Sequence, residues 1–361
     1  MTKPPAQHVR TRPQAHTRLY LGLGAVAAIG LSGLALSTCT SSPPAHTGAR
    51  ATTTTKAPPP PPPTCPLTGT AAPAGVPARP ALGVKIDNIP AARPQSGLDK
   101  ADVVFEEPVE GGITRLVAVF QCQEAPSVGP VRSARNVDIG ILGQLGNPLE
   151  VHVGGIQPVL ANINASPIVN VDLGAYGAIE NHPAGRYAPE DTYSTTALMW
   201  GTHPTMTTPP PPLFAFSPTA PAGSPVASVH VPFSGYSDVT WKYNAAISAF
   251  QRFYNGTAPD MLADGAQTTA ANVIVQYVHI SYGPWVESGC CSLEVQSDLY
   301  PGASGRSEVF RGGVAIPGTW TRSTLGSATR FVNAAGAPIN LQPGQTWVEL
   351  LPDTITATTT P

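Results

Sequence analysis

Five arginines fall in short polar segments between residues 87 and 194 of a chain in which only 12% of residues are charged. A guanidinium group binds a carboxylate or a phosphate through two parallel hydrogen bonds. If these side chains converge after folding, they form a pocket for an anion. The alternative is that they pair with nearby acidic residues and hold loops together. The five residues are Arg93, Arg115, Arg132, Arg135 and Arg186.

Other polar residues in the same segments could complete such a pocket. Each segment lies at the end of an expected strand or in the loop after it, where α/β domains place their binding groups. Ser133 is expected to begin a helix, which would add backbone N–H donors for an anion. The candidate ligand-binding residues besides the arginines are Asp87, Asn88, Gln95, Ser96, Glu110, Ser133 and His152.

The carboxylates of this region allow a second interpretation, a hydrolase or transferase. Glycosidases use two carboxyl groups about 5 to 10 Å apart. Glu106 and Glu110 could face one cleft across the turn at Pro108, whereas Glu106 and Glu107 should point to opposite sides of their strand. A histidine, His152 or His182, could then act as a base oriented by Asp172.

No complete catalytic signature accompanies these residues. Ser96 lies in Gln-Ser-Gly, without the Gly-x-Ser-x-Gly elbow of hydrolases. The chain also has no Walker loop, dinucleotide-binding fingerprint or His-Glu-x-x-His motif. We therefore expect no cofactor and no metal site, and we favour a binding protein over an enzyme.

The elements that position these residues indicate an α/β domain over residues 66–201. Apolar runs predict four strands, the third of them buried on both faces, and Val137, Ile141 and Leu145 recur at helical spacing after Ser133. Strands that alternate with helices are typical of an α/β fold. The expected strands are Ala81–Ile86, Asp102–Glu106, Ile113–Gln121 and Leu149–Val153, with a further helix over Pro158–Ile163.

The rest of the chain indicates a mainly β domain over 226–352, so that the whole is α+β. A Pro-rich segment, 202–225, reads as a surface loop or linker, and the tail 353–361 should fray. Val239, Trp241 and Tyr243 alternate with polar residues, as in a half-buried strand. The expected strands are 227–233, 239–243, 249–254, 272–281, 291–299, 314–320, 329–332 and 346–350.

The amino-terminal region reads as an export signal over 1–38. A basic leader precedes the uncharged run Leu19–Leu36, and Leu36-Ser37-Thr38-Cys39 is similar to a bacterial lipobox, although Thr38 departs from its usual small residue. Cys39 would carry the lipid, and 39–65, with six consecutive prolines, would form an extended, disordered stalk. An uncleaved signal anchor or cleaved soluble export are the alternatives. All three place the folded part outside the cytoplasm.

Composition limits the partners and the compartment. The formal net charge is −2 and no basic stripe is present, which argues against nucleic acid. Disulfides are the default outside the cell, and we favour Cys65–Cys122 with a vicinal Cys290–Cys291 pair. The abundance of Pro, Gly, Ala and Thr suggests an actinobacterium.

These segments together resemble the YerB-like lipoproteins, a bacterial family with two domains of unknown function (domain of unknown function 3048). The resembling stretches include Lys85-Ile86-Asp87-Asn88, Arg93-Pro94-Gln95-Ser96-Gly97, Gly129-Pro130-Val131-Arg132-Ser133-Ala134-Arg135 and Pro343-Gly344-Gln345-Thr346-Trp347. The family tends to carry Ala-Pro-His-Asn where this chain has Ala188-Pro189-Glu190-Asp191. The resemblance implies a lipid-anchored, two-domain envelope protein and brings no established reaction.

The sequence thus favours a membrane-anchored protein of the cell envelope that binds an anionic wall component or a protein partner through its arginines. The hydrolase or transferase, and a structural scaffold in which the arginines are internal ties, are the two alternatives.

Overall fold

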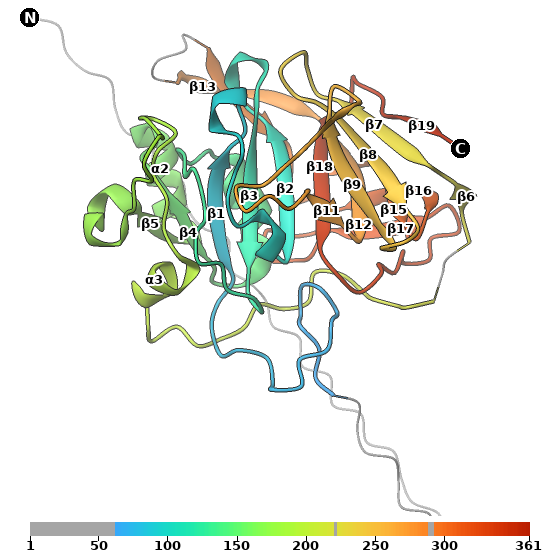
Figure 1. Ribbon diagram of the computed structural model, residues 1–361, viewed down its shortest axis with the longest axis horizontal. Helices are drawn as coiled ribbons and strands as arrows, with labels where there is room; N and C mark the ends of the chain where they lie inside the picture. The colour runs from blue at the N-terminus through green and yellow to red at the C-terminus, as the bar shows by residue number, and fades with distance from the viewer. Residues whose placement is uncertain (1–61, 220–221, 288–291) are drawn as a thin grey trace, which may run out of the picture. The chain divides into compact units, whose positions relative to one another are not determined.

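The computed structural model describes residues 62–361 apart from 220–221 and 288–291. The expected leader, the lipid-bearing Cys39, most of the stalk and the Cys290–Cys291 pair lie outside the described residues. Strands predominate in the part described, and the helices are few and short (Figure 1). None of those helices has the length and apolar character that crossing a membrane requires. The chain is therefore mostly β, with less helix than the expected α/β half implied.

The helices and strands differ widely in length, and several strands are very short. The helices are α1 (Val137–Leu142), α2 (Gln157–Asn164) and α3 (Thr196–Gly201). The strands are β1 (Leu82–Asp87), β2 (Val103–Pro108), β3 (Thr114–Phe120), β4 (Leu149–His152), β5 (Val169–Asp172), β6 (Ser224–Pro225), β7 (Ser228–Pro232), β8 (Asp238–Asn244), β9 (Ala249–Tyr254), β10 (Ala258–Pro259), β11 (Thr269–Ala270), β12 (Asn272–Val278), β13 (Ile280–Val286), β14 (Leu293–Ser297), β15 (Ser304–Arg311), β16 (Val314–Thr321), β17 (Arg330–Asn333), β18 (Thr346–Pro352) and β19 (Thr358–Thr360).

One large sheet joins the two halves of the chain. Its strand order is β17-β16-β15-β12-β18-β2-β3-β1-β4-β5. β18, from the last part of the chain, pairs in parallel with β2, so that Thr346 lies opposite Val103. Because this pairing is made of backbone hydrogen bonds between segments more than 200 residues apart, the expected domains 66–201 and 226–352 are joined through a common sheet.

The large sheet is covered on both faces. All residues of β3 are buried, as the apolar run Ile113–Gln121 predicts. On one face the second sheet, β10-β9-β8-β7-β19, packs through Trp241, whose ring lies 5.2 Å from that of Trp347. On the other face α1 and α2 contribute Ile141 and Val159 to the core around β2 and β3. The residues of the central strands β12, β18, β2, β3 and β1 are therefore buried, apart from Pro108 and Pro352 at strand ends.

Several expected elements differ from those observed. The single strand expected over 272–281 is two strands, β12 and β13, and β5, β15 and α3 have no counterpart in the expectation. The tail was expected to fray, but Thr358–Thr360 forms β19, which pairs with β7. The segment 202–225 does run as a loop, yet it buries Leu213 and pairs β6 with β16.

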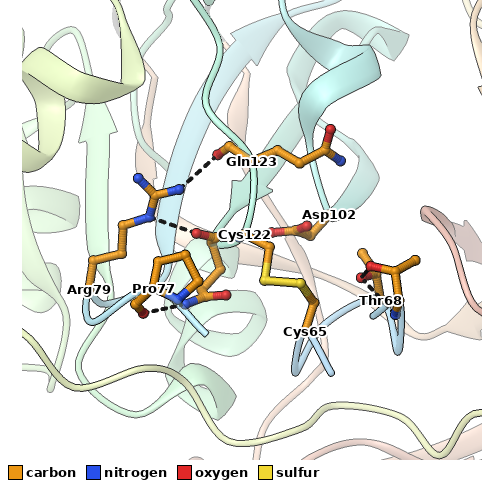
Figure 2. Close-up of a disulfide and its surroundings, with 9 residues drawn as sticks. Cys65, Thr68, Pro77, Arg79, Asp102, Cys122 and Gln123 are labelled. Carbon is orange, nitrogen blue, oxygen red and sulfur yellow. Dashed lines mark hydrogen bonds between the residues drawn. A yellow bond between two sulfur atoms is a disulfide. The ribbon is translucent and has the colours of Figure 1, made fainter. Parts of the chain in front are cut away.

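The disulfide between Cys65 and Cys122 is present, as predicted (Figure 2). It ties the beginning of the described chain to the end of β3, with a Cα–Cα distance of 6.0 Å. Arg79 reinforces the same connection by donating to the Gln121 and Gln123 carbonyls. Asp102 accepts a hydrogen bond from the Cys122 N–H, which links the beginning of β2 to the end of β3.

Candidate functional site

The carboxyl ends of β1, β4 and β5 meet at one edge of the large sheet. The three strands are parallel to one another, and they end at Asp87, His152 and Asp172. β3 runs antiparallel to β1 and begins at this edge, which places Arg115 opposite Asp87. Polar residues that are far apart in sequence therefore come together here, as in the binding sites of other α/β sheets.

A segment between β3 and α1 inserts where β1 and β4 separate. The Asp87 N–H donates to the Pro130 carbonyl, and the Arg132 N–H donates to the Lys85 carbonyl. On the other side, the Val153 N–H donates to the Arg132 carbonyl over 3.0 Å. These bonds hold residues 130–134 between the two strand ends, so that Arg132 and Ser133 lie at the sheet edge.

Arg115 is a buried cation without a counter-ion. Only 6% of its surface is exposed, and Nη1 donates to the Ser133 carbonyl over 2.8 Å. Its Nε has no acceptor, and no carboxylate within the described ranges lies within ion-pair distance of it. Burial lowers the pKa of Arg115 to about 10, and the positive charges of Arg135 and Arg132 act in the same direction, whereas the carboxylates of Asp87 and Glu110 oppose them. A buried guanidinium whose carboxylates all lie beyond ion-pair distance is costly for folding.

The two neighbouring arginines are already paired. Arg132 donates from Nε to Asp87 over 2.7 Å and remains 24% exposed. Arg135 donates twice to Oε2 of Glu110, over 3.0 and 2.8 Å, and lies 3.3 Å from Glu287. We name Arg115, Arg132 and Arg135 the edge cluster.

The other two arginines serve a different segment. Arg93 stacks 3.4 Å from the ring centroid of Tyr254 and donates to the Asn88 carbonyl. Arg186 donates to the carbonyls of Ala91, Ala92 and Pro94. The five guanidinium groups thus divide into the edge cluster and a pair that holds residues 88–94.

The remaining polar residues of the predicted pocket largely satisfy one another. Asn88 donates to Glu106 and Thr114, and it accepts from Gln95 and from the Tyr254 hydroxyl. The Ser96 N–H donates to the Gly129 carbonyl. Ser133 does not begin a helix: α1 starts at Val137, after Asn136. The reason is that residues 130–134 are extended by their bonds to β1 and β4.

Glu106 and Glu110 face opposite sides of the sheet. Glu106 is fully buried and pairs with Arg252 over 2.5 Å, on the side of the second sheet. Glu110 contacts Arg135 and accepts from the Val295 N–H over 3.0 Å, on the other side. Burial opposes the charge on Glu110, but Arg135 and the Val295 bond outweigh it and hold its pKa below the usual value. This pair cannot flank one glycosidic bond.

The two candidate histidines are also apart from the glutamates. His152 is fully buried, with Nδ1 2.9 Å from the Gly154 carbonyl and Nε2 2.6 Å from Oδ1 of Asn170. His182 has a side chain that is 52% exposed and lies 3.4 Å from Glu180 and 3.3 Å from Asp191. Within the described ranges, no group of three or more His, Cys, Asp and Glu side chains has the arrangement of a metal site.

Two buried charge clusters were not expected from the sequence. Lys85 binds Glu107 and Asp138 beneath the edge cluster, with Glu150 beside them. On the other face Arg252 joins Glu106 and Asp260, close to Glu349. The sequence feature that could have predicted these clusters is a charged residue inside an otherwise apolar strand, as in Leu82–Asp87 and Leu149–His152.

A cleft of about 660 Å³ adjoins the edge cluster at Glu110. The loop 108–112 forms one wall, and the β13–β14 hairpin forms the other. Its side chains are mostly apolar, and Tyr282 and Leu293 remain 66% and 44% exposed. The arginines and this cleft are therefore neighbours with Glu110 between them.

Comparison with known proteins identifies the family. Residues 67–207 match the model described as "Protein of unknown function (DUF3048) N-terminal domain", and residues 229–348 match the corresponding C-terminal domain. The chain belongs to the DUF3048 family.

One curated member of the DUF3048 family is the Bacillus subtilis (strain 168) protein named "Putative lipoprotein YerB". It is 28% identical to this chain over 299 residues, which are 80% of this chain and 86% of that protein. A crystal structure of the YerB protein from Bacillus subtilis has the same fold. Its TM-score is 0.72 at 23% identity, over 82% of this chain and 99% of that one. The edge cluster therefore lies within residues 67–207, the part of the chain that matches the N-terminal domain of this family.

Proposed function

We propose that this protein is a lipid-anchored, extracytoplasmic binding protein of the bacterial cell envelope, and that it holds an anionic ligand at the edge cluster. The anchor is supported by the leader that ends at Cys39 and by the name of the B. subtilis relative. The ligand would be a wall component or an acidic surface of a partner protein.

The binding proposal depends on one observation, that Arg115 is buried and that its Nε has no hydrogen-bond acceptor. Natural proteins rarely bury a charged side chain without a partner, because the loss of hydration is not repaid. Arg115 is buried, its Nε has no acceptor, and the charges of two further guanidinium groups and of the carboxylates of Asp87 and Glu110 act on it from beyond ion-pair distance. An anion at this edge would supply the acceptor that the Arg115 Nε lacks, which is a reason for keeping an arginine here.

The hydrolase alternative has less support. It requires two carboxyl groups on one substrate, whereas Glu106 is fully buried against Arg252 and Glu110 is bound to Arg135. The scaffold alternative, in which the arginines only tie loops together, is decided by the binding experiment.

The experiment is a pull-down with purified wall fractions, quantified against the charge-matched variant. Arg115→Gln combined with Arg132→Gln should abolish retention of the protein. Arg306→Gln combined with Arg330→Gln removes the same charge from exposed positions of β15 and β17 and should leave retention unchanged. Equal retention of both double variants would reject the edge cluster as the site, and no retention of the wild type would favour the scaffold.

The anchor has its own test. Intact mass of the protein extracted from membranes should show a chain that begins at Cys39 and carries acyl groups, because one chain alone gives only marginal membrane binding. A mass that includes the unmodified leader would contradict lipidation and favour the signal anchor.

A further inference from the structure

Another buried arginine without a counter-ion lies toward the opposite edge of the large sheet from the edge cluster (Figure 1). Arg311 is the last residue of β15, near the β17 edge, and only 2% of its surface is exposed. All 22 acidic residues of the chain lie within the described ranges, and none of them forms an ion pair with Arg311. Burial lowers the pKa of Arg311, and no neighbouring carboxylate opposes this effect. The protein therefore supplies no negative charge to compensate this buried cation.

The guanidinium of Arg311 is held by backbone carbonyls and keeps an unused donor. Nη1 donates to the Asn340 carbonyl over 2.8 Å, and Nη2 donates to the carbonyls of Ser217 and Thr219, each over 2.9 Å. Nε has no acceptor within the described ranges. Arg322, by contrast, is a buried arginine whose Nε, Nη1 and Nη2 each donate to an acceptor in the loop that follows it. Carbonyl oxygens orient the Arg311 guanidinium but do not neutralise it, so its charge and its Nε–H remain unmatched.

Arg311 lines a cavity of about 300 Å³ whose wall also includes residues of β16 and β17. The polar side chains of this wall carry hydroxyl or amide groups, and they belong to Ser217, Thr219, Asn333 and Asn340. Ile316 supplies apolar surface, and none of the described residues that line the cavity is acidic. The cavity thus presents one positive charge among neutral groups that can hydrogen-bond.

Asn333 contributes donors to this wall. Its Oδ1 accepts from the N–H groups of Ala335 and Ala337, each over 3.0 Å. Its Nδ2 donates to no acceptor in the part of the chain that the structure describes. The side chain is therefore oriented by its oxygen, and its two amide hydrogens are left for another partner.

We propose that this cavity binds a small carboxylic acid that also carries hydroxyl groups, the class of the sugar acids. One guanidinium matches the single charge of a carboxylate, whereas a phosphate monoester carries close to two charges at neutral pH. Hydroxyl and amide groups both donate and accept, so they can pair with the hydroxyl groups of such a ligand. A volume of about 300 Å³ is at the lower end of the range for small-molecule sites, which favours a single small molecule over a polymer. This site differs from the edge cluster, and the inference does not depend on the proposed function.

Asn333 provides a test that leaves every bond of Arg311 in place. In Asn333→Asp the new carboxylate can still accept from the Ala335 and Ala337 N–H groups, but it adds a negative charge to the cavity wall. An anionic ligand should therefore be repelled. The matched control is Asn255→Asp, the same change at an exposed turn residue whose φ of 48° an aspartate tolerates.

The measurement is calorimetric titration of the full-length protein in detergent and chloride buffer, with glucuronate and with glucose. We expect the wild type and Asn255→Asp to bind glucuronate alike, and Asn333→Asp to bind it about tenfold more weakly. Glucose, which has the same ring without the carboxylate, should also bind about tenfold more weakly than glucuronate. Equal affinity of Asn333→Asp and Asn255→Asp would exclude this cavity as the site. Equal binding of glucose and glucuronate would overturn the role of the charge.

Two further arms complete the test. Arg311→Gln should lose glucuronate binding; because it also breaks the bonds to three carbonyls, its far-ultraviolet circular dichroism is compared with that of the wild type. Arg115→Gln combined with Arg132→Gln should leave glucuronate binding unchanged, and a loss in that variant would assign the acid to the edge cluster instead. Failure of the wild type to bind glucuronate, glycerate or lactate would overturn the ligand class and would leave the proposed function untouched.

Discussion

Arg115 and Asp87 are register partners in β3 and β1, yet they do not form an ion pair. Asp87 accepts from Arg132, and the Arg115 guanidinium donates instead to the Ser133 carbonyl. The segment 130–134 supplies the alternative partner of each group, Arg132 for the Asp87 carboxylate and the Ser133 carbonyl for the Arg115 guanidinium. Arg115, although buried, is thereby left without the carboxylate that strand pairing would have offered it.

This arrangement predicts that Arg115 contributes little to stability. Arg115→Gln should change the free energy of unfolding by about 1 kcal/mol or less, in either direction, because it removes a buried charge that has no counter-ion. Arg135→Gln, which leaves Glu110 buried and unpaired, should cost about 3–5 kcal/mol. Urea unfolding followed by fluorescence gives both values, and an Arg115→Gln cost close to that of Arg135→Gln would show that Arg115 is a structural tie.

The buried cluster around Lys85 predicts that stability falls as the pH rises. Burial raises the pKa of Glu107 to about 8 and that of Glu150 well above its usual value, and neither oxygen of Glu150 accepts a hydrogen bond. Groups with a raised pKa in the folded state stabilise it fully below their unfolded pKa. This contribution is lost as the pH rises toward the folded value. The free energy of unfolding should decrease between about pH 5 and pH 8, by a few kcal/mol.

Glu150→Gln tests the origin of this dependence, since an amide does not ionise. The variant should show a flatter stability profile and should be more stable than the wild type at pH 8. Glu124→Gln, at a side chain that is 61% exposed, is the control and should follow the wild-type profile. An unchanged slope in Glu150→Gln would rule out this carboxyl as its source.

The contact between Arg252 and Glu106 predicts that the two halves of the chain unfold together. Arg252 is fully buried, bonds Glu106 and Asp260, and lies among Trp241, Tyr254 and Trp347. Arg252→Met should cost about 3–5 kcal/mol, because it leaves two buried carboxyl groups without their cation. Near-ultraviolet circular dichroism and far-ultraviolet circular dichroism should lose their signals in one common transition; two separate transitions would show that the halves are independent.

The disulfide predicts a redox-dependent stability. Cys65 and Cys122 are 57 residues apart, and a loop of this length gives about 4 kcal/mol in the chain-entropy model. Cys65→Ser combined with Cys122→Ser should lower the melting temperature. Dithiothreitol should not lower the melting temperature of this double variant further, because the bond that it would reduce is absent. A wild type whose melting temperature equals that of the double variant would contradict a stabilising role.

Much of the fold followed from local patterns that the chain alone carries. The apolar run over Ile113–Gln121 specified a strand buried on both faces, and the alternation at Val239, Trp241 and Tyr243 specified β8, because side-chain period depends only on the backbone. The exported leader predicted disulfides, and the Cys65–Cys122 bond is the pairing favoured among the three that four cysteines allow. These are properties of neighbouring residues or of composition.

The placement of the charges depended on pairings that no local pattern encodes. β18 lies beside β2 because segments far apart in the chain share one core, and the insertion of residues 130–134 decided which arginine would be paired. The sequence by itself determined which residue types were available at the strand ends, and it named all three arginines of the edge cluster. Only the tertiary structure separated them from Arg93 and Arg186 and left Arg115 without a counter-ion, because burial and ion pairing depend on contacts made across the whole sheet.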